Sequence, residues 1–539
     1  DLVVQLESPR SVTGALQRVG RSGHLLQATS KGRIIPLYPA DLDDAVAMTR
    51  CMKHGDIEET VVPENCLDVL AQQIVAEVAM QQWSRQELYR LVRQSYCYRN
   101  LTITAFDHVL EMLSGRFAES PLRALKPRIT WDRVNDQLIP RRGARLLATM
   151  NAGTIPDRGY FGVYLADSNT KLGEMEEEFV FESRVGDVFF LGSNEWRIHQ
   201  ITHDRIFVLP VKSIKPRAPF WKGDSLSRDF STSIKIAAFR RELLEKMDRG
   251  ECDSWLISNF GSDEAIAKSL KQYFQRQQTH TGIVPTDKQL LGEWFCDRVD
   301  EPHFILHAPF GARVNGIWAI AIAAALEKQF HLQVQYAFDD NGIIIRLLDT
   351  NEPPPMADIL KLSTDEIEKL LMEALVDSPI FAVRFRYNAM RALLLPRSQP
   401  HKRLPLWLQR LRAADLLQVV RQFPDFPIVV ETYRDCLEDV FDLPALRKVL
   451  DRLQRGEIRI QFVQTPYPSP MASGLIFRFL ASNLYEDDHT RMTSQATSIS
   501  SEFLAEILSR ENIPTVVTPE IIEIAEAHWQ HRSLDTRNH

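Results

Sequence analysis

The alternation of apolar strands and helices at the start of the chain most constrains its fold. Residues 2–6 form an apolar, β-branched run that predicts a buried strand, and residues 33–38 predict a second strand. Ser11 opens a helix between these runs, and another helix is predicted over residues 42–53. Strand, helix, strand and helix in this order are typical of the closing portion of an α/β sheet domain, which we assign to residues 1–60.

Residues 61–150 change in character, because three amphipathic helices precede two short strands. Ser84 and Glu87 make a capping box at the start of the second helix. Three helices followed by a hairpin is the order of a winged helix. A generic three-helix bundle with a trailing hairpin is the alternative.

Residues 151–222 alternate apolar and polar positions between turn signals, which predicts a small antiparallel β module. Its predicted strands are 161–166, 178–183, 187–191, 195–202 and 205–210.

Residues 223–539 are mixed α/β, with a β-α-β-β unit in the middle. The predicted strands are 304–308, 332–338 and 343–348, and the predicted helices are 232–248, 262–277, 286–296, 314–329, 364–375, 388–395, 406–422 and 444–454.

Composition excludes several classes of protein. The chain has 539 residues, a net charge of −7 and six cysteines. The charge argues against a uniformly basic nucleic-acid coat, although a local basic stripe can still bind nucleic acid. The cysteines form no C-x-x-C pair, which excludes the common zinc spacings and a disulfide framework and fits a reducing cytoplasm. No apolar run is long enough to cross a bilayer, so no membrane partner is predicted.

Two arginines, Arg18 and Arg21, are three residues apart on the first predicted helix, and Gly20 and Gly23 let backbone approach closely. A guanidinium group offers a planar fork to phosphate oxygens. An arginine finger of this kind stabilises charge on a transferring phosphoryl group. The alternative is a solvated basic helix start.

The stretch Gln17-Arg18-Val19-Gly20-Arg21-Ser22-Gly23-His24 resembles the last conserved motif of superfamily 2 helicases. Together with blocks farther along, the chain resembles the large-helicase-related (Lhr) family over roughly residues 1–485. The blocks are Arg141-Arg142-Gly143-Ala144-Arg145, Asn151-Ala152-Gly153-Thr154-Ile155-Pro156-Asp157, Gly186-Asp187-Val188-Phe189, Pro219-Phe220-Trp221-Lys222-Gly223-Asp224, Leu306-His307-Ala308-Pro309-Phe310-Gly311-Ala312-Arg313-Val314-Asn315, Phe385-Arg386-Tyr387-Asn388-Ala389-Met390-Arg391-Ala392 and Pro468-Ser469-Pro470-Met471-Ala472.

The resemblance implies an ATP-dependent helicase that moves 3′ to 5′ on single-stranded DNA and unwinds DNA or RNA:DNA duplexes, with roles in DNA repair. It implies that Arg18 and Arg21 are catalytic, and that Gln17, Arg18, Arg21 and His24 contact ATP. The cofactors would be ATP and Mg²⁺. It also implies the fold class, an α+β multidomain protein made of the end of a RecA-like α/β motor domain (1–60), a winged helix (61–150), a small antiparallel β module (151–222) and a mixed α/β helicase-associated domain (223–539).

The chain departs from the family in one decisive way, because it contains neither a G-x-x-x-x-G-K-[ST] phosphate loop nor a D-E-x-H box. It starts at Asp1 inside an apolar run, so we expect it to be the later part of a helicase core. The ATP and Mg²⁺ site would then be completed only by a missing N-terminal segment, and we expect no hydrolysis by this chain alone. The segment 225–229 also lacks the family's usual Gly-Arg-Pro-rich continuation.

Two residues are candidates for contact with a nucleic-acid strand. Trp221 lies between turn residues, where an indole could stack on a base of any identity. The alternative is a tryptophan that fills a domain junction. Ile155 follows a Gly-Thr turn, where an apolar tip could wedge between base pairs. The alternative is an ordinary buried isoleucine at a strand start. The resemblance implies a strand-contacting role for both.

The densest basic cluster of the chain lies on and just after the predicted wing, where phosphate contacts are expected. A solvated charged face is the alternative. Its members are Arg141, Arg142 and Arg145, with Lys126, Arg128 and Arg133. His307 lacks partners at metal-ligand spacing and is interpreted as a core or near-core histidine.

Three functions are compatible with these observations. The first is part of a helicase that binds single-stranded nucleic acid and completes the ATP site with Arg18 and Arg21. The second is a non-catalytic nucleic-acid-binding accessory protein that lacks the motor. The third is a plain protein-interaction scaffold.

Overall fold

A computed structural model gives the fold of most of the chain. It describes residues 2–23, 29–37, 39–115, 125–155, 160–176, 180, 183, 185–186, 188–191, 194–202, 205–211, 227–260, 264–296, 302–332, 334–347, 354–396, 398–399, 402–404 and 406–476.

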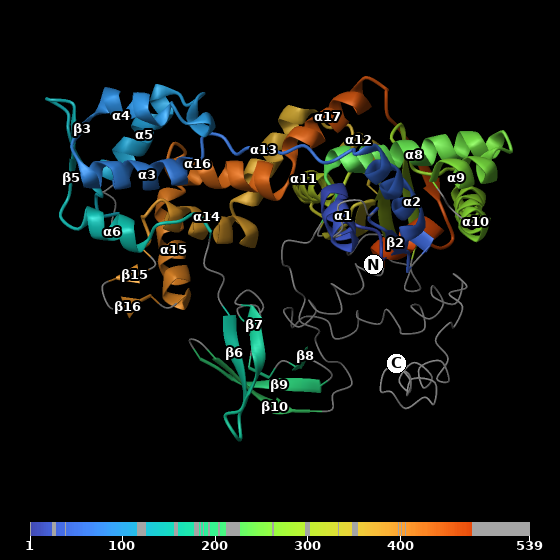
Figure 1. Cartoon of the computed structure of the whole chain (residues 1–539), viewed down its shortest axis with the longest axis horizontal. Helices are drawn as coiled ribbons and strands as arrows, with labels where there is room; N and C mark the ends of the chain where they lie inside the picture. Colours follow the sequence, from blue (N-terminus) through green and yellow to red (C-terminus); the bar gives the residue numbers. More distant parts are fainter. Residues whose placement is uncertain are drawn as a thin grey trace.

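The N-terminal unit has the predicted order of strand, helix, strand and helix. Strands β1 (Val3–Leu6) and β2 (Gly32–Ile35) pair in parallel. Helix α1 (Val12–Val19) and a single 3₁₀ turn connect them, and helix α2 (Pro39–His54) follows. Figure 1 shows this unit beside the helices that begin after residue 227.

Helix α2 shares a hydrophobic core with later parts of the chain. Its Val46 and Met48 lie in one buried cluster with Phe239 of helix α8 (Phe230–Asp248). Helices α9 (Cys252–Phe260) and α10 (Glu264–Thr281) complete this cluster. The N-terminal unit is therefore joined to the segment after residue 227 by apolar packing.

The winged-helix order predicted for the next segment is confirmed in three helices and a three-stranded sheet. Helix α5 begins after Thr102, whose hydroxyl group caps it by accepting from the Ala105 N–H group over 3.2 Å. The capping box of Ser84 and Glu87 is present as predicted. The helices are α3 (Leu67–Met80), α4 (Arg85–Val92) and α5 (Ile103–Ser114), and the sheet order is β3 (Trp83–Ser84), β5 (Gln137–Pro140), β4 (Ile129–Asp132).

The β module is a five-stranded sheet, but it is not purely antiparallel as predicted. Its order is β7 (Lys171–Glu176), β6 (Tyr160–Leu165), β10 (Arg205–Pro210), β9 (Asn194–Ile201), β8 (Val188–Leu191). Strands β6 and β10 pair in parallel at the centre of the sheet. On its other side, each of them pairs with an antiparallel neighbour, β6 with β7 and β10 with β9. The prediction missed β7, and its strand at 178–183 falls mostly outside the described residues.

A second five-stranded sheet forms the core of the C-terminal part. Its order is β13 (Val334–Phe338), β14 (Gly342–Leu347), β12 (Pro302–His307), β11 (Gln289–Cys296), β17 (Arg459–Gln464). The prediction of a helix at 286–296 is wrong, because this segment is β11, which pairs with β12 on one side and β17 on the other. Helix α11 (Ala312–Phe330) packs on β13 and β14 of this sheet, and α13 (Thr364–Leu375) and α17 (Leu443–Gln454) pack on α11 and on each other.

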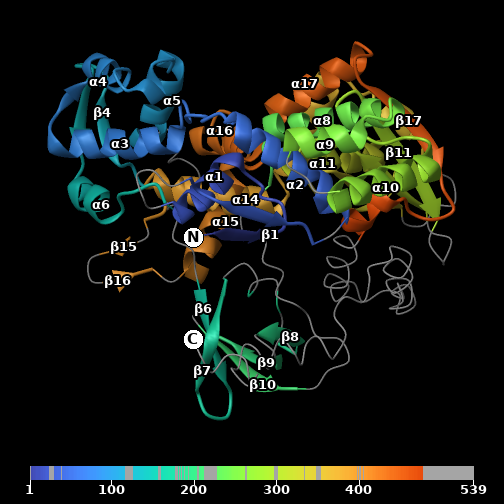
Figure 2. The ribbon, with the colours of Figure 1, turned by 45° about the vertical axis from the view of Figure 1, so that its right-hand side comes forward.

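A group of late helices packs against the winged helix rather than against this sheet. Helices α14 (Pro379–Arg391) and α16 (Pro427–Arg434) both contact α3. Figures 1 and 2 show them beside α3, with α15 (Leu406–Val420) next to α14. The prediction placed a helix at 388–395 in place of α14 and missed α16.

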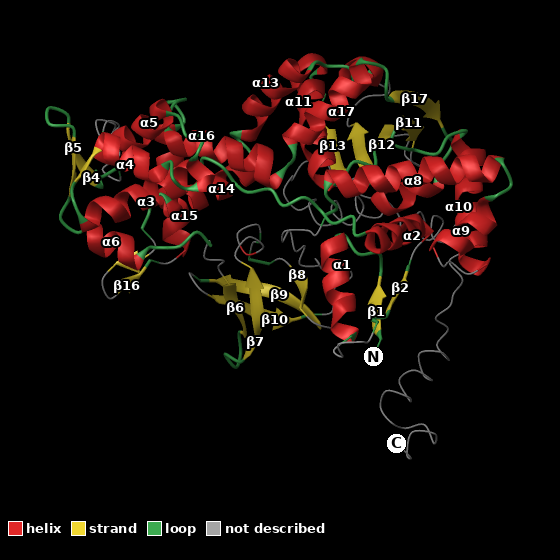
Figure 3. Ribbon diagram, turned by 45° about the horizontal axis from the view of Figure 1, so that its top comes forward, coloured by secondary structure: helices red, strands yellow, loops and turns green. Residues whose placement is uncertain are grey.

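The remaining elements are short. They are α6 (Ala144–Met150), α12 (Met356–Ile359), β15 (Ser398–Gln399), β16 (Lys402–Arg403), a π-helical turn at Asp435–Val440, and 3₁₀ turns at Gly20–Ser22, Tyr96–Tyr98 and Pro470–Ala472. Figure 3 shows two groups of helices, one around α3 and α14 and the other around α8 and α11, with the second five-stranded sheet in the latter group. Across the described residues, no helix combines the length and apolarity needed to span a membrane.

Candidate nucleotide and strand-binding sites

The arginine motif lies on an exposed surface of a helix that is fixed at both ends. Gln17 and Arg18 are exposed on α1, and Arg21 is exposed in the 3₁₀ turn that follows it. Arg18 donates to the Gln5 Oε1 atom of β1 over 3.1 Å. Arg21 has no ion-pair partner among the described residues. His24, the fourth predicted contact, lies outside the described residues.

The start of the arginine helix is held by two side chains. Ser11 caps it by accepting from the Gly14 N–H group over 3.1 Å. Glu58 accepts from the N–H groups of Val12 and Thr13 and from the Thr13 hydroxyl group, the last over 2.7 Å. Burial opposes the charge of Glu58, but the hydrogen bonds from Thr13 outweigh it and lower the pKa of this carboxyl group. Sequence reasoning missed Glu58, because it lies more than forty residues from its partners.

Ser22 fixes the end of the same helix against the strand that follows. Its hydroxyl oxygen lies 2.7 Å from the Val19 carbonyl oxygen and accepts from the Lys31 N–H group over 2.9 Å. A Cβ atom on Gly23 would lie 2.5 Å from the Ser30 hydroxyl oxygen, and one on Gly32 would lie 2.6 Å from a Val19 methyl carbon. The close approach predicted at Gly23 is therefore confirmed, whereas the one predicted at Gly20 is wrong, because a Cβ atom there would meet no atom within 4 Å.

A buried ion network holds helix α2 to the segment after residue 227. Arg228 is 1% exposed, and its guanidinium group contacts the Asp44 carboxylate of α2 over 2.5 Å. The backbone N–H group of Arg228 donates to the Asp340 carboxylate over 3.1 Å. Arg240 of α8 pairs with Asp43 over 2.5 Å. Burial raises the pKa of Asp43, and the neighbouring Arg240 acts against that shift.

Asp340 connects this network to the second five-stranded sheet. The residue lies in the turn between β13 and β14, and it also accepts from the Ala312 N–H group at the start of α11 over 2.9 Å. A negative charge at a helix N-terminus is favourable. Helix α2 is thus tied through Arg228 to the start of α11.

The basic cluster divides in the structure. Arg141, Arg142 and Arg145 are exposed around the start of α6, and they have no acidic partner among the described residues. Arg128 points inward and donates to the Leu394 carbonyl oxygen over 2.8 Å. Burial also lowers the pKa of Arg128. Because its side chain points inward, the prediction that Arg128 belongs to an exposed phosphate-binding surface is wrong.

Lys126 and Arg133 complete that cluster. Lys126 is exposed, whereas the Arg133 guanidinium group lies over the Trp131 ring at 4.0 Å and pairs with Glu111 over 3.4 Å. Arg141, Arg142, Arg145 and Lys126 are therefore the exposed members of the cluster that have no ion-pair partner among the described residues.

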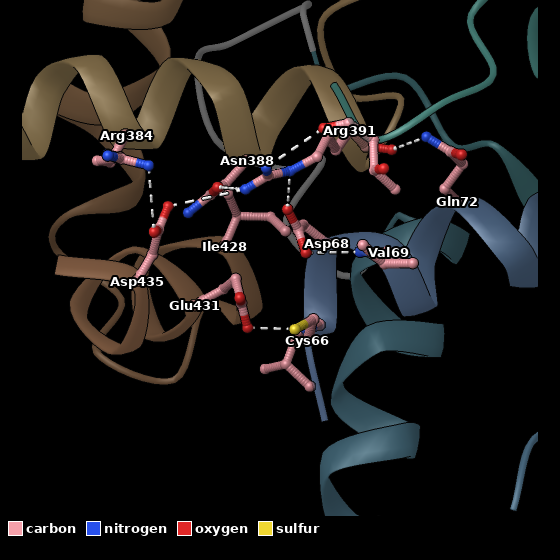
Figure 4. A network of polar contacts seen from close by, with 12 residues as sticks. Cys66, Asp68, Val69, Gln72, Arg384, Asn388, Arg391, Ile428, Glu431 and Asp435 are labelled. Carbon is pink, nitrogen blue, oxygen red and sulfur yellow. Dashed lines mark hydrogen bonds and ion pairs between the residues drawn. The ribbon is translucent and has the colours of Figure 1, made fainter. Parts of the chain in front are cut away.

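Ile155 lies on a loop whose backbone is hydrogen-bonded to two helices. Its side chain is 84% exposed, which contradicts the alternative of an ordinary buried isoleucine. The loop begins after α6 and is hydrogen-bonded to Gln72 of α3 and Arg391 of α14. Figure 4 shows the side chains of Gln72 and Arg391. Trp221, the other predicted strand contact, lies outside the described residues.

His307 lies in the core, as predicted, and it has a partner that the sequence did not reveal. It is 3% exposed, and its Nε2 atom lies 2.7 Å from the Glu293 carboxylate, which Ser469 also contacts over 2.7 Å. Burial opposes ionisation of Glu293, but the bonds from His307 and Ser469 lower its pKa below the ordinary value. Among the described residues no cluster could hold a metal ion, and these groups join β11, β12 and the segment after β17.

Comparisons with known protein families match two segments. Residues 50–217 match the family described as "Large helicase-related protein, winged helix domain", and residues 284–472 match "DEAD/H associated".

Individual relatives match almost the whole chain. The chain is 40% identical over 536 residues to "Lhr helicase/ probable uracil glycosylase" of Mycolicibacterium smegmatis, covering 98% of this chain and 35% of the relative. It is 33% identical over 495 residues to "ATP-dependent helicase Lhr-Core" of Methanothermobacter thermautotrophicus, covering 90% of this chain and 57% of the relative. The chain thus spans only part of the length of these proteins.

A solved structure matches the fold. The "Structure of Mycobacterium smegmatis helicase Lhr bound to ssDNA and AMP-PNP" has a TM-score of 0.69 and 38% identity, and it covers 88% of this chain and 56% of that one. A winged helix combined with a DEAD/H-associated region defines a helicase-type, multidomain α/β protein. Within that class, the chain belongs to the large-helicase-related (Lhr) family.

Proposed function

We propose that this chain is the part of an ATP-dependent 3′-5′ helicase that binds single-stranded nucleic acid and completes the ATP site. The observation that carries the proposal is the exposed arginine pair, Arg18 on α1 and Arg21 in the 3₁₀ turn that follows, in a segment held in place by Ser11, Glu58 and Ser22. A fixed guanidinium group facing solvent suits a role on a phosphate brought by another lobe. The relative solved with AMP-PNP supports nucleotide binding in the family.

In this proposal Arg18 and Arg21 are catalytic, and Gln17 and His24 contact the nucleotide. ATP with Mg²⁺ binds between this surface and a lobe that carries a phosphate loop, because the 539 residues contain no such loop. This chain alone therefore does not hydrolyse ATP. Its six cysteines are all free, which fits work in a reducing cytoplasm.

The proposed nucleic-acid surface comprises Arg141, Arg142 and Arg145 for phosphates, with Ile155 and Trp221 for bases. Three exposed guanidinium groups that meet no acidic partner in the described part of the chain can replace the counterions of a strand. The apolar tip at Ile155 suits contact with a base step. The ligand is single-stranded DNA, and the substrate to be unwound is a DNA or RNA:DNA duplex. The relative solved with single-stranded DNA supports this choice of ligand.

Replacing Arg141, Arg142 and Arg145 together by alanine is expected to flatten the salt dependence of binding. Each lost phosphate contact on a single strand reduces the slope of log K against log salt by about 0.7, so three contacts reduce it by about 2. Fluorescence anisotropy with a labelled single-stranded oligonucleotide at several salt concentrations measures the slope.

The matched control for this triple variant replaces Arg421, Arg447 and Arg455, which also removes three positive charges. These three arginines each pair with an acidic residue, so their loss should leave the slope within experimental error. An unchanged slope in the first variant would remove α6 from the proposed surface. No binding by the unmodified chain at low salt would favour a protein-interaction scaffold.

Replacing Trp221 by alanine is expected to weaken single-strand binding without changing the salt slope. Stacking of one base on an aromatic ring contributes roughly 1–3 kcal/mol, which corresponds to about a 5- to 150-fold rise in Kd. Trp221→Phe should retain part of the affinity, because it keeps an aromatic face. Equal affinities of the alanine variant and the unmodified chain would show that Trp221 does not contact the strand.

A non-catalytic accessory protein that binds nucleic acid is the second candidate, and the absence of a phosphate loop in these 539 residues favours it. The reading frame before Asp1 distinguishes the two. A phosphate loop and a D-E-x-H box there support the helicase. Their absence, with an initiator methionine close by, supports the accessory protein.

A further inference from the structure

The loop that carries Ile155 is bound by one side-chain amide from the winged helix. Gln72 of α3 is 4% exposed, and its Oε1 atom accepts from the Gly153 N–H group over 3.2 Å. Its Nε2 atom donates to the Gly153 carbonyl oxygen over 3.2 Å and to the Arg391 carbonyl oxygen over 2.8 Å. One buried glutamine therefore pairs with both backbone polar groups of Gly153, which would otherwise need other partners.

Arg391 holds the next residue of the loop from the side of α14. Its guanidinium group contacts Asp68 of α3 over 2.5 Å, Asn388 one turn earlier on α14, and Asp435 over 3.7 Å (Figure 4). It also reaches the Thr154 carbonyl oxygen over 3.5 Å.

Two buried carboxylates keep Arg391 where it is. Asp68 is 1% exposed, so moving Arg391 would take the paired cation away from a buried carboxylate. Asp435 is 2% exposed and would keep only its contact with Arg384, over 3.5 Å, of these two ion pairs. The position of the loop is therefore linked to the packing between α3, α14 and the turn after α16.

The loop is also fixed at its start, so that little freedom remains before Ile155. Asn151 is 1% exposed, and its side-chain amide donates to the Leu147 carbonyl oxygen of α6 over 3.1 Å. Gly153 adopts a φ of 103°, a conformation that a residue with a side chain rarely takes. Ile155 follows these fixed residues and presents an 84% exposed apolar side chain.

We infer that Gln72 and Arg391 are positioning residues for nucleic-acid contact by Ile155. Neither side chain touches the strand. They hold the Gly153–Thr154 backbone in place before the strand binds. Contact between Ile155 and a base step then does not require the loop to become ordered, which would cost conformational entropy. The inference rests on the proposed function, because it takes Ile155 as a strand contact. It adds that the winged helix and α14 jointly set the place of that contact.

A double-mutant cycle tests this inference with the whole chain and a forked DNA oligonucleotide that has a single-stranded tail. Ile155→Ala should raise the Kd on the order of fivefold, within the range of one base contact. Gln72→Leu should raise it by a similar factor when Ile155 is present and by less than about twofold when Ile155 is alanine, because coupled residues are not additive. Gln73→Leu, the exposed neighbour on the same helix, should have no effect in either background.

A second variant acts from the loop side and leaves α3 and α14 intact. Gly153→Ala strains the backbone at a positive φ, and it should show the same loss of effect when Ile155 is alanine. It keeps the test decisive if Gln72→Leu fails to fold, which thermal unfolding would reveal.

The outcomes separate the inference from the proposed function. If Ile155→Ala weakens binding while Gln72→Leu and Gly153→Ala do not, the positioning role is wrong and the proposed function stands. If either variant weakens binding equally in both backgrounds, its effect is structural and the positioning role is also overturned. If Ile155→Ala has no effect while the salt-dependent binding persists, Ile155 is not a strand contact, and the inference falls with that part of the proposal. If the unmodified chain does not bind the DNA, the proposed function itself fails.

Discussion

Replacing Arg21 by alanine is expected to slow ATP hydrolysis by about 10³- to 10⁵-fold, the range found for arginine fingers. The same is expected of Arg18→Ala. Both side chains are exposed on a helix whose start and end are hydrogen-bonded, so the guanidinium groups can meet a phosphate without rearrangement of the backbone. The measurement is the kcat of DNA-stimulated hydrolysis by a protein that joins this chain to a lobe with a phosphate loop.

The controls for the arginine variants separate charge from geometry. Arg33→Ala removes an exposed arginine from the neighbouring strand β2 and should leave kcat nearly unchanged. Arg21→Lys keeps the charge but loses the planar fork, so it should recover only a small part of the rate. Loss of transition-state stabilisation lowers kcat while the affinity for ATP changes much less. Unchanged kcat in both alanine variants would exclude the arginine motif from catalysis.

Replacing Arg228 by methionine is expected to lower the free energy of unfolding by about 3–5 kcal/mol, because it removes a fully buried cation from between two buried carboxylates. Asp44 is 1% exposed and Asp340 is 7% exposed, and both face the Arg228 side chain. Arg10 and Arg240 remain, but they lie farther from Asp44, at 3.8 and 3.6 Å against 2.5 Å for Arg228. Guanidinium chloride denaturation followed by tryptophan fluorescence gives the shift in midpoint. Adding Asp44→Asn to the variant should recover part of the loss, since the carboxylate that lost its nearest cation is then neutral.

Arg50 provides the matched control for Arg228. Arg50 of α2 pairs with Glu242 of α8 over 2.6 Å, but both side chains are about one-third exposed. Arg50→Met should therefore cost no more than about 1 kcal/mol. Equal losses from Arg228→Met and Arg50→Met would contradict the view that the buried network stabilises the junction of α2 with the later helices.

Local patterns predicted those elements whose stability is local. The capping box of Ser84 and Glu87 marks the start of α4, and the Asn341-Gly342 turn marks the hairpin of β13 and β14. The alternation of strand and helix in the first sixty residues also predicted the N-terminal unit. In the first two cases the residues that form the cap or the turn lie within a few positions along the chain, whereas β1 and β2 pair across 29 positions.

Elements that depend on distant partners were the ones predicted wrongly. Segment 286–296 contains leucine, glutamine and glutamate, which favour a helix, yet it is a strand between β12 and β17. Glu293 in this strand is fully buried, and its carboxylate is satisfied by His307 and Ser469. Tertiary pairing overrides intrinsic propensity here. The parallel pair of β6 and β10 likewise depends on the meeting of two separate antiparallel strand pairs.

The sequence analysis predicted exposed residues of the candidate site, but it missed the buried residues that hold them in place. Motif spacing pointed to Arg18 and Arg21, but nothing near Gly153 in sequence announces Gln72 as its partner, which lies 81 residues earlier. Arg391 and Asp68 are 323 residues apart. A residue that orients another is recognisable only once the fold has brought the two together.

The shared core of α2 and α8 restricts where this protein can be divided. Leu42, Val46 and Met48 fill the same apolar cluster as Ile236 and Phe239. A shortened polypeptide that starts after α2 would expose that cluster on α8 and α10 to water and invite aggregation. Any recombined or proteolytically shortened form that folds is therefore expected to retain the segment that contains α2 together with the later helices.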